Sequence, residues 1–244
     1  MIQIADAYPF PFSIHKSPLL FRIIKNDPQN NPPSLSGLTG EISNDTLNEK
    51  RVTMKNDQKR WDKRFKGKAF ALGKAANFFL RKHLRFLPRG RALDLATGEG
   101  RNAIFLAQHG FEVDAVDLSE IGLRKASRWA REKGVSIRTI LADLDSYPIE
   151  KERYDLIANF YFLNRRLIPK MKRGVRKGGM VVFETYLLEH RDLHVGGPTN
   201  RKYFLKPNEL LTLFRGFRIL FYREGIFREG GKRKAIASLI AQKP

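Results

Sequence analysis

The chain has 244 residues, of which 42% are hydrophobic and 11% aromatic; this composition supplies a folded core and excludes a wholly disordered chain. The 46 lysines and arginines outnumber the 25 aspartates and glutamates, giving a formal net charge of +21, which attracts anions without choosing between nucleic acid and a small molecule. The lack of cysteine excludes disulfides, thiolate metal sites and a cysteine nucleophile. No apolar run reaches the ~18 residues that a membrane-spanning helix needs, so we expect a cytoplasmic protein.

Residues 1–55 differ in composition from the rest of the chain. Half of the 12 prolines fall by position 33, and the segment 26–40 is rich in Asn, Pro, Ser and Gly. We therefore predict an irregular or disordered extension over 1–55, followed by one domain over 56–244. Met54 is an alternative start, because the regular pattern begins just after it.

The rest of the chain alternates predicted helices and strands. Helices are expected over 71–87, 101–108, 120–133, 165–177 and 207–214, and strands over 92–96, 111–117, 135–143, 154–160, 180–186, 217–224 and 235–242. Strand–helix alternation implies right-handed crossovers and a parallel sheet. Gly230-Gly231 joins the last two strands as a hairpin. We predict an α/β fold with a doubly wound, seven-stranded sheet, mostly parallel with a C-terminal antiparallel hairpin strand.

The most informative stretch is a strand that runs into two glycines and then a helix, Leu93-Asp94-Leu95-Ala96-Thr97-Gly98-Glu99-Gly100-Arg101-Asn102. Glycine adopts positive φ, and we expect a β-carbon at Gly98 or Gly100 to obstruct a ligand that approaches the backbone. The following helix offers free N–H groups to a carboxylate or phosphate. This loop therefore predicts a ligand site.

Acidic residues end the next two predicted strands. Asp117 can accept hydrogen bonds from both hydroxyls of a ribose. Asp143 can accept one from the amino group of an adenine packed on Leu118 or Leu144. Because open α/β sheets bind ligands at the carboxyl ends of their strands, we expect these acids to line one site with Asp94.

Two ligand classes remain open from the residues alone. Gly98-x-Gly100-x-x-Ala103 also satisfies the dinucleotide fingerprint, which keeps an NAD(P)-dependent oxidoreductase as an alternative. Asp94 argues against a pyrophosphate, because an acid inside the strand suits a cationic or amino-bearing ligand. The predicted antiparallel hairpin also departs from an all-parallel dinucleotide domain.

The segment from Asp94 to Asn102 resembles motif I of the class I S-adenosylmethionine-dependent methyltransferases. Asp117, Asp143 and Asn159-Phe160-Tyr161 fall where later motifs of that family fall. Within the class, Gly98–Asn102, the opening Trp61-Asp62-Lys63-Arg64-Phe65 and the tail 204–242 are most similar to the tellurite-resistance branch. One departure is Ala96, which stands where the family has its first motif glycine.

The resemblance implies a Rossmann-like fold and S-adenosyl-L-methionine as cofactor. The cofactor-binding residues that it implies are Asp94, Ala96, Gly98, Gly100, Asn102, Asp117, Leu118, Asp143, Leu144 and Asn159. It places Asn159 and Tyr161 beside the methyl group, and Arg228 where the branch has an arginine near its acceptor, with Phe227 replacing the histidine that often precedes it. His190 is a candidate proton acceptor. No His, Asp or Glu spacing suggests a metal site.

The resemblance and the charge together predict methyl transfer to a small, anionic acceptor molecule. An RNA or protein methyltransferase is an alternative, because the predicted helix 165–177 contains seven cations and no acid. If the helix does not bind nucleic acid or an acidic partner, its cations form a solvent-exposed outer face. A binding module that has lost catalysis is a further alternative.

Overall fold

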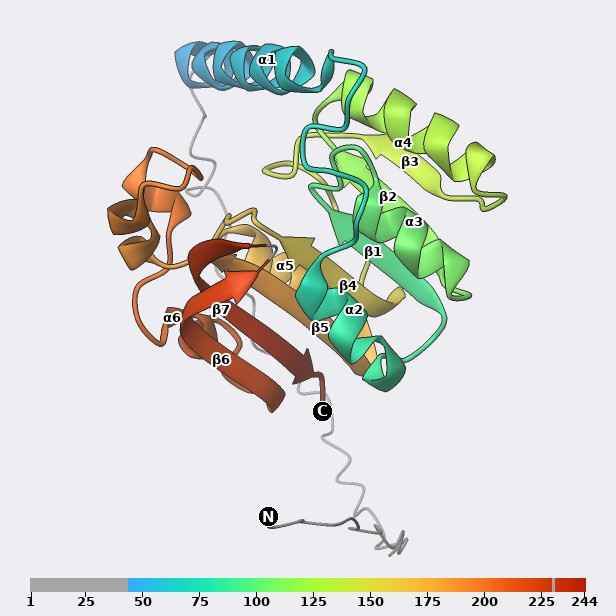
Figure 1. Cartoon of the computed structure of the whole chain (residues 1–244), viewed down its shortest axis with the longest axis vertical. Coiled ribbons are helices and arrows are strands. Elements are labelled where there is room, and N and C mark those ends of the chain that lie inside the picture. Colours follow the sequence, from blue (N-terminus) through green and yellow to red (C-terminus); the bar gives the residue numbers. More distant parts are fainter. Residues whose placement is uncertain (1–43, 230) are drawn as a thin grey trace, which may run out of the picture. The chain divides into compact units, whose positions relative to one another are not determined.

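A computed structural model describes residues 44–229 and 231–244, which form a seven-stranded sheet in the order β3-β2-β1-β4-β5-β7-β6 (Figure 1). The strands are β1 (Arg91–Leu95), β2 (Glu112–Asp117), β3 (Arg138–Leu141), β4 (Tyr154–Phe160), β5 (Val175–Tyr186), β6 (Arg218–Glu229) and β7 (Lys232–Gln242). Strands β1 to β5 pair in parallel, whereas β7 is antiparallel to both β5 and β6. The predicted mixed α/β sheet is confirmed.

Helices cover both faces of the sheet. They are α1 (Asn44–Phe65), α2 (Phe78–His83), α3 (Arg101–Gln108), α4 (Glu120–Glu132), α5 (Leu167–Gly174) and α6 (Glu209–Leu213), with 3₁₀ turns η1 (Leu84–Phe86), η2 (Leu188–Leu193) and η3 (Arg201–Tyr203). One layer of the core packs α5 and α6 against the sheet, and the other packs α2 and α3. All residues of β4 are buried, as expected for a parallel strand covered on both faces.

The predicted extension is wrong for residues 44–55, which belong to α1. This segment contains no proline or glycine and is rich in helix formers, so it continues the helix upstream of Trp61. Residues 1–43 lie outside the described part of the chain. Within that described part, no helix combines the length and the apolar character needed to cross a bilayer.

The predicted helix over 71–87 is shorter in the structure. Gly73 has a φ of +71°, and the helix begins at residue 78 because the Asn77 side chain accepts a hydrogen bond from Leu80 N–H at 3.2 Å. Ser119 caps α4 in the same way, since its side chain accepts from Gly122 N–H at 3.0 Å. Capping residues therefore set both helix starts.

The predicted basic helix also ends early, at Gly174, because Val175 begins β5. Several of its cations have partners within the chain. Lys170 donates to the backbone carbonyl oxygens of Asp145 and Tyr147, and Lys172 donates to that of Arg215. These contacts fix α5 on the domain and give no support to a nucleic-acid surface there.

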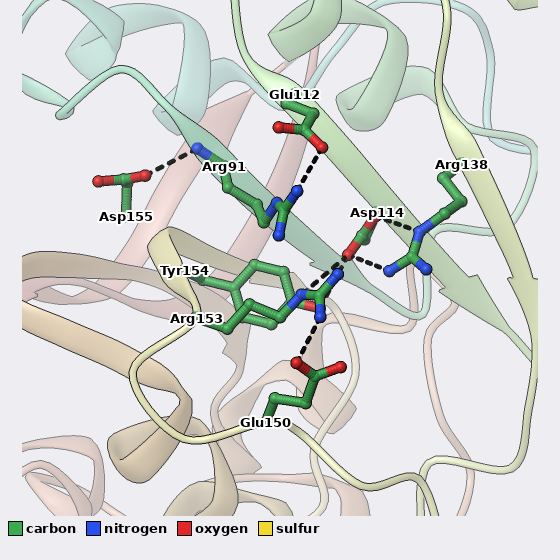
Figure 2. Close-up of polar contacts among 8 residues, drawn as sticks. All are labelled: Arg91, Glu112, Asp114, Arg138, Glu150, Arg153, Tyr154 and Asp155. Carbon is green, nitrogen blue, oxygen red and sulfur yellow. Dashed lines mark hydrogen bonds and ion pairs between the residues drawn. The ribbon is translucent and has the colours of Figure 1, made fainter.

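A polar cluster joins the amino ends of the parallel strands (Figure 2). Asp114 of β2 accepts hydrogen bonds from Arg138 Nε at 2.7 Å and from the Tyr154 hydroxyl at 2.9 Å. Burial alone would raise the pKa of Asp114, but these two donors outweigh it and lower the pKa. Arg91 and Glu112, the first residues of β1 and β2, pair beside this cluster at 2.6 Å. The cluster is structural and lies at the edge opposite the predicted ligand site.

Candidate functional site

Three predicted site residues meet at the carboxyl ends of β1 and β2. Asp94 is 1% exposed, and its Oδ2 accepts a hydrogen bond from the Thr97 hydroxyl at 2.6 Å. Asp117 Oδ2 accepts from Gly98 N–H at 2.7 Å, and its Oδ1 accepts from Ser119 N–H at 2.8 Å. The two carboxylates and the glycine loop thus form one hydrogen-bonded unit on neighbouring strands, which we call the carboxylate pair.

Burial makes both members of the carboxylate pair difficult to ionise. Desolvation raises the pKa of Asp94 to about 7, although the Thr97 hydroxyl and the Arg101 charge oppose it, and Asp117 raises it further. Burial also raises the pKa of Asp117 against its backbone donors. A carboxylate oxygen can accept two hydrogen bonds, so Asp117 retains capacity for hydroxyl donors. The pair suits a ligand that brings positive charge and hydroxyl groups.

The glycine loop has positive φ at alternate residues, +55° at Ala96, +58° at Gly98 and +84° at Gly100. This conformation strains Ala96, and such strain concentrates at functional sites. A β-carbon at Gly100 would lie 2.6 Å from Ala126 Cβ of α4, and one at Gly98 would lie 3.3 Å from the Phe65 ring. The glycines therefore let the loop pack against α4 and α1, which is a reason for glycine at both positions that the sequence did not reveal.

Two of the predicted adenine-binding residues, Asp143 and Leu144, lie just after β3, and the third, Leu118, directly follows β2. Asp143 is half-buried, and its Oδ1 accepts from Asp145 N–H at 2.9 Å. Ala142 N–H donates to Asp117 O at 3.0 Å, which ties this segment to the carboxylate pair. Leu144 belongs to the core and Leu118 is half-buried. Of the two leucines, only Leu118 therefore has substantial exposed surface.

A chain of buried amides and acids, not predicted from sequence, extends from α3 to the far strands. Asn102 Oδ1 accepts from Asn77 N–H at 2.8 Å, so the predicted cofactor residue Asn102 holds the start of α2. Asn77 Nδ2 donates to Glu184 Oε1, and the Ser238 hydroxyl donates to Glu184 Oε2, each at 2.7 Å. Glu184 is fully buried, so these donors satisfy a charge that would otherwise be costly.

Segment 66–77 is bound to the glycine loop by Glu99, which sits between the two glycines. Glu99 Oε2 accepts from Ala71 N–H at 2.7 Å, and Glu99 forms an ion pair with Lys125 of α4. The Lys125 ammonium also donates to backbone carbonyl oxygens at positions 65, 67 and 69. Asp62 adds a contact from α1, because its Oδ1 accepts from Ile121 N–H at 3.1 Å. These residues hold α1 and segment 66–77 against the loop.

Two of the predicted catalytic residues lie near the carboxyl end of β4: Asn159 is the sixth residue of the strand, and Tyr161 directly follows it. Asn159 Nδ2 donates to Phe162 O at 2.6 Å and closes the turn that follows. Tyr161 has a φ of +57°, and its hydroxyl accepts a hydrogen bond from Lys234 Nζ at 3.0 Å. Ala96 and Tyr161, which follow the adjacent strands β1 and β4, are thus both strained non-glycine residues.

The geometry does not favour His190 as a proton acceptor. His190 is 3% exposed and stacks on Tyr186 with ring centroids 4.1 Å apart. Because Ala235 N–H donates to Nδ1 at 3.2 Å, the ring proton lies on Nε2, which donates to Gly196 O at 2.9 Å. Burial lowers the pKa of His190. Both nitrogens therefore serve to fix the loop after β5.

Arg228 lies on the opposite face of the β6–β7 hairpin from Lys234. It pairs in register with Arg233, whereas Phe227 pairs with Lys234. Since successive strand residues point to opposite faces, Lys234 rather than Arg228 shares a face with Tyr161. The structure begins β7 at Lys232 rather than at the predicted residue 235, so the first residues of the strand include a cation, Lys234, that the sequence did not indicate.

Comparison with known proteins agrees with this geometry. Residues 92–179 match the family model of a methyltransferase domain. Over 143 residues the chain is 27% identical to TehB, a probable S-adenosyl-L-methionine-dependent methyltransferase of Haemophilus influenzae, covering 56% of this chain and 49% of that protein. The similarity is to methyltransferase domains of the S-adenosyl-L-methionine-dependent class. It spans about half the length of the curated TehB proteins that it matches.

The chain shows two further similarities. Over 98 residues it is 32% identical to a malonyl-[acyl-carrier protein] O-methyltransferase of Salmonella typhimurium, covering 38% of each chain. The crystal structure of TehB from H. influenzae superposes with a TM-score of 0.60 at 21% identity, covering 77% of this chain and 67% of that one. The structural likeness shows a shared fold.

S-adenosylmethionine is the cofactor of this class of domain, and the carboxylate pair fits it. The cofactor carries an ammonium group, a sulfonium and a ribose diol. Asp94 is a buried carboxylate whose ionisation a nearby cation would favour. Asp117 is held by two backbone donors and still has lone pairs for hydroxyl groups. These side chains therefore match the chemical groups that the cofactor presents.

Proposed function

We propose that this chain is an S-adenosylmethionine-dependent methyltransferase that acts on a small, anionic acceptor. The observation that carries the proposal is the carboxylate pair, joined through Thr97 and Gly98 at the carboxyl ends of adjacent parallel strands. Open α/β sheets bind their ligands at this edge. The family match over residues 92–179 supports the same assignment.

Each part of the cofactor has candidate residues. Asp94 and the glycine loop would hold the amino-acid end, Asp117 the ribose, and Asp143 the adenine amino group beside Leu118. When bound, the cofactor supplies a methyl group that its sulfonium has already activated. The chain itself then has to position the acceptor, exclude water and accept a proton where the acceptor carries one.

Segment 66–77 and α1 are suited to excluding water from the site. Lys125 and Glu99 hold this segment against the glycine loop through backbone and ionic contacts. Water exclusion strengthens the electrostatic interactions inside a site and suppresses side reactions. The contacts described for this segment thus support a role in covering the bound cofactor.

The charges beside β4 and β5 support an anionic acceptor. Tyr161 and Tyr186 follow or end these strands, with ring centroids 4.9 Å apart. Lys234 donates to the Tyr161 hydroxyl. Burial raises the pKa of Tyr186, whereas the nearby charges of Arg101 and Arg64 oppose that rise. Cations from three separate segments therefore lie close to the two tyrosines.

Calorimetry on the full chain tests the proposal. S-adenosylmethionine and S-adenosylhomocysteine should bind, and NAD and NADP should not. Asp117→Ala should weaken binding of S-adenosylhomocysteine by ~1–3 kcal/mol, the scale of lost charged hydrogen bonds. The exposed carboxylate of Asp192 in η2 provides the matched control Asp192→Ala. Tight binding of a nicotinamide dinucleotide, or unchanged affinity in folded Asp117→Ala, would refute the assignment.

A further inference from the structure

Lys234 lies at the same edge of the sheet as the predicted methyl-transfer site. Strand β7 runs antiparallel to β5, and its Ile236 pairs with Tyr186 at the carboxyl end of β5. Lys234 precedes Ile236 by two residues, so the two side chains point to the same face of the sheet. Its half-buried ammonium donates to the Tyr161 hydroxyl at 3.0 Å and lies 4.9 Å from the centroid of that ring.

Tyr161 is held in place from several sides. It directly follows β4, and its N–H donates to Glu184 O at 2.8 Å. Its left-handed backbone is costly for a tyrosine and persists only where the surroundings enforce it. The neighbouring Tyr186 ring packs 4.9 Å away. The phenol is therefore presented in one orientation at the end of the strand next to β1.

We propose that Tyr161 is the general base of the reaction, with Lys234 as the residue that positions and polarises its hydroxyl. An ammonium donating to a phenolic oxygen stabilises the phenolate relative to the phenol. His190, the other candidate, has both nitrogens engaged with backbone groups. This inference rests on the proposed function and adds that the acceptor carries its nucleophile as an O–H or N–H group.

The step balances with these groups alone. A lone pair of the acceptor oxygen or nitrogen forms the new bond to the methyl carbon. The sulfur–methyl bond breaks, and its electron pair stays on sulfur, which becomes neutral. The proton of the acceptor passes to the Tyr161 phenolate oxygen and from there to solvent. Lys234 remains charged throughout.

Other charged groups near the Tyr161 hydroxyl also influence its ionisation. Glu184 contacts Tyr161 through its backbone, and its carboxylate accepts from Asn77 and Ser238 and lies 3.5 Å from Arg223 Nη2. On the β7 side, Lys234 contributes to lowering the pKa of His190. A negative Glu184 disfavours the phenolate and the cations favour it, but Lys234 is the group in direct contact with the phenol oxygen.

Spectroscopic titration of tyrosine at alkaline pH tests this pair without an acceptor. An ordinary phenol ionises near pH ~10, and burial raises the pKa of Tyr154, Tyr186 and Tyr222. We expect one tyrosine to ionise at least about one pH unit below the ordinary value. That step should vanish in Tyr161→Phe and remain in the matched control Tyr186→Phe.

Variants of Lys234 separate polarisation from a structural role. Lys234→Met should move the early ionisation upward by about one pH unit or more, and Lys234→Arg should restore most of the shift. Circular dichroism identifies folded variants, and Lys234→Gln replaces any that fail to fold. An ordinary pKa for Tyr161, or a shift unaffected by loss of the Lys234 charge, overturns the proposal.

Binding of S-adenosylhomocysteine distinguishes the two levels of inference. Tyr161→Phe should bind it within about twofold of the unchanged protein, because the phenol takes no part in holding the carboxylate pair's ligand. Loss of binding in the unchanged protein would refute the proposed function. Normal binding together with an unperturbed Tyr161 would refute only the general base.

Discussion

The buried Asp94 makes cofactor binding depend on pH in a direction that can be worked out. Its pKa in the folded protein is raised to about 7, above the ordinary value of about 3.9 in an unfolded chain. Its contribution to folding stability is therefore fully present below about pH 4 and is lost as pH rises toward 7. An ammonium group bound beside Asp94 favours the carboxylate, so binding should release a proton.

The magnitude follows from the fraction of Asp94 that is ionised before binding. With a pKa of about 7, that fraction rises roughly tenfold between about pH 6 and pH 8, so affinity should rise about tenfold, or about 1.4 kcal/mol. Near pH 7 about half a proton should be released per ligand bound. The charge of Arg101 favours the ionised form of Asp94, and the charge of Asp117 disfavours it. Both residues are unchanged in every protein that is compared.

Calorimetry of S-adenosylhomocysteine in buffers of different ionisation enthalpy measures the released proton directly. 5′-Methylthioadenosine, which lacks the amino-acid end, is the matched ligand control and should release none. Asp94→Asn should bind S-adenosylhomocysteine more weakly and with no dependence on pH in this range. Equal pH dependence for the two ligands, or pH-independent binding of S-adenosylhomocysteine, would refute the placement of the ammonium beside Asp94.

Further predictions concern the glycine loop and the segment packed on it. Ala96→Gly should leave the free energy of unfolding in urea within about 0.5 kcal/mol or raise it, because relief of roughly 1–2 kcal/mol of left-handed strain offsets the added freedom of the unfolded chain. Ala107→Gly in α3 relieves no strain and should lower the free energy of unfolding by about 1 kcal/mol. An equal loss of stability in the two variants would contradict strain at Ala96. Gly100→Ala should cost roughly 2 kcal/mol or more, because its β-carbon would lie 2.6 Å from a side-chain carbon of α4; an unchanged melting temperature would exclude that packing role. Lys125→Met should speed amide hydrogen exchange in segment 66–77 and leave the exchange rates of α6 unchanged. An equal change in the two regions would contradict the role of Lys125 in holding that segment.

The grouping of the carboxylate pair with the glycine loop was predictable because these residues are close in sequence. Asp94, Gly98 and Asp117 lie within one strand–loop–helix–strand unit, and the order of these elements places them at one edge of the sheet. Their hydrogen bonds are local to this unit: Asp94 accepts from the Thr97 hydroxyl three residues on, and Asp117 accepts from the N–H groups of Gly98 and Ser119. What the pattern could not reveal was the direction of the missing β-carbons, which depends on how α1 and α4 pack.

The rest of the candidate site was not predictable because its contacts cross long distances in sequence. Asn77 and Glu184 are 107 residues apart, and Glu184 and Ser238 are 54 apart. A lone acid in an apolar strand carries no pattern that names its donors. His190 illustrates the same limit: it was predicted as a proton acceptor, yet η2 buries it against Tyr186.

The position of Glu99 links these two parts of the candidate site physically. Positive φ at Gly98 and Gly100 on either side fixes the path of the loop, while the Glu99 carboxylate binds Ala71 N–H and Lys125. Segment 66–77, which these contacts hold, ends at Asn77. The Asn77 side chain donates to the buried carboxylate of Glu184, whose backbone oxygen accepts from Tyr161 N–H. A shift of the glycine loop on ligand binding would therefore act on the segment that also braces β5. The acid between the two glycines therefore ties the loop to segment 66–77 and to α4, so the candidate ligand loop is also part of the packing of the domain.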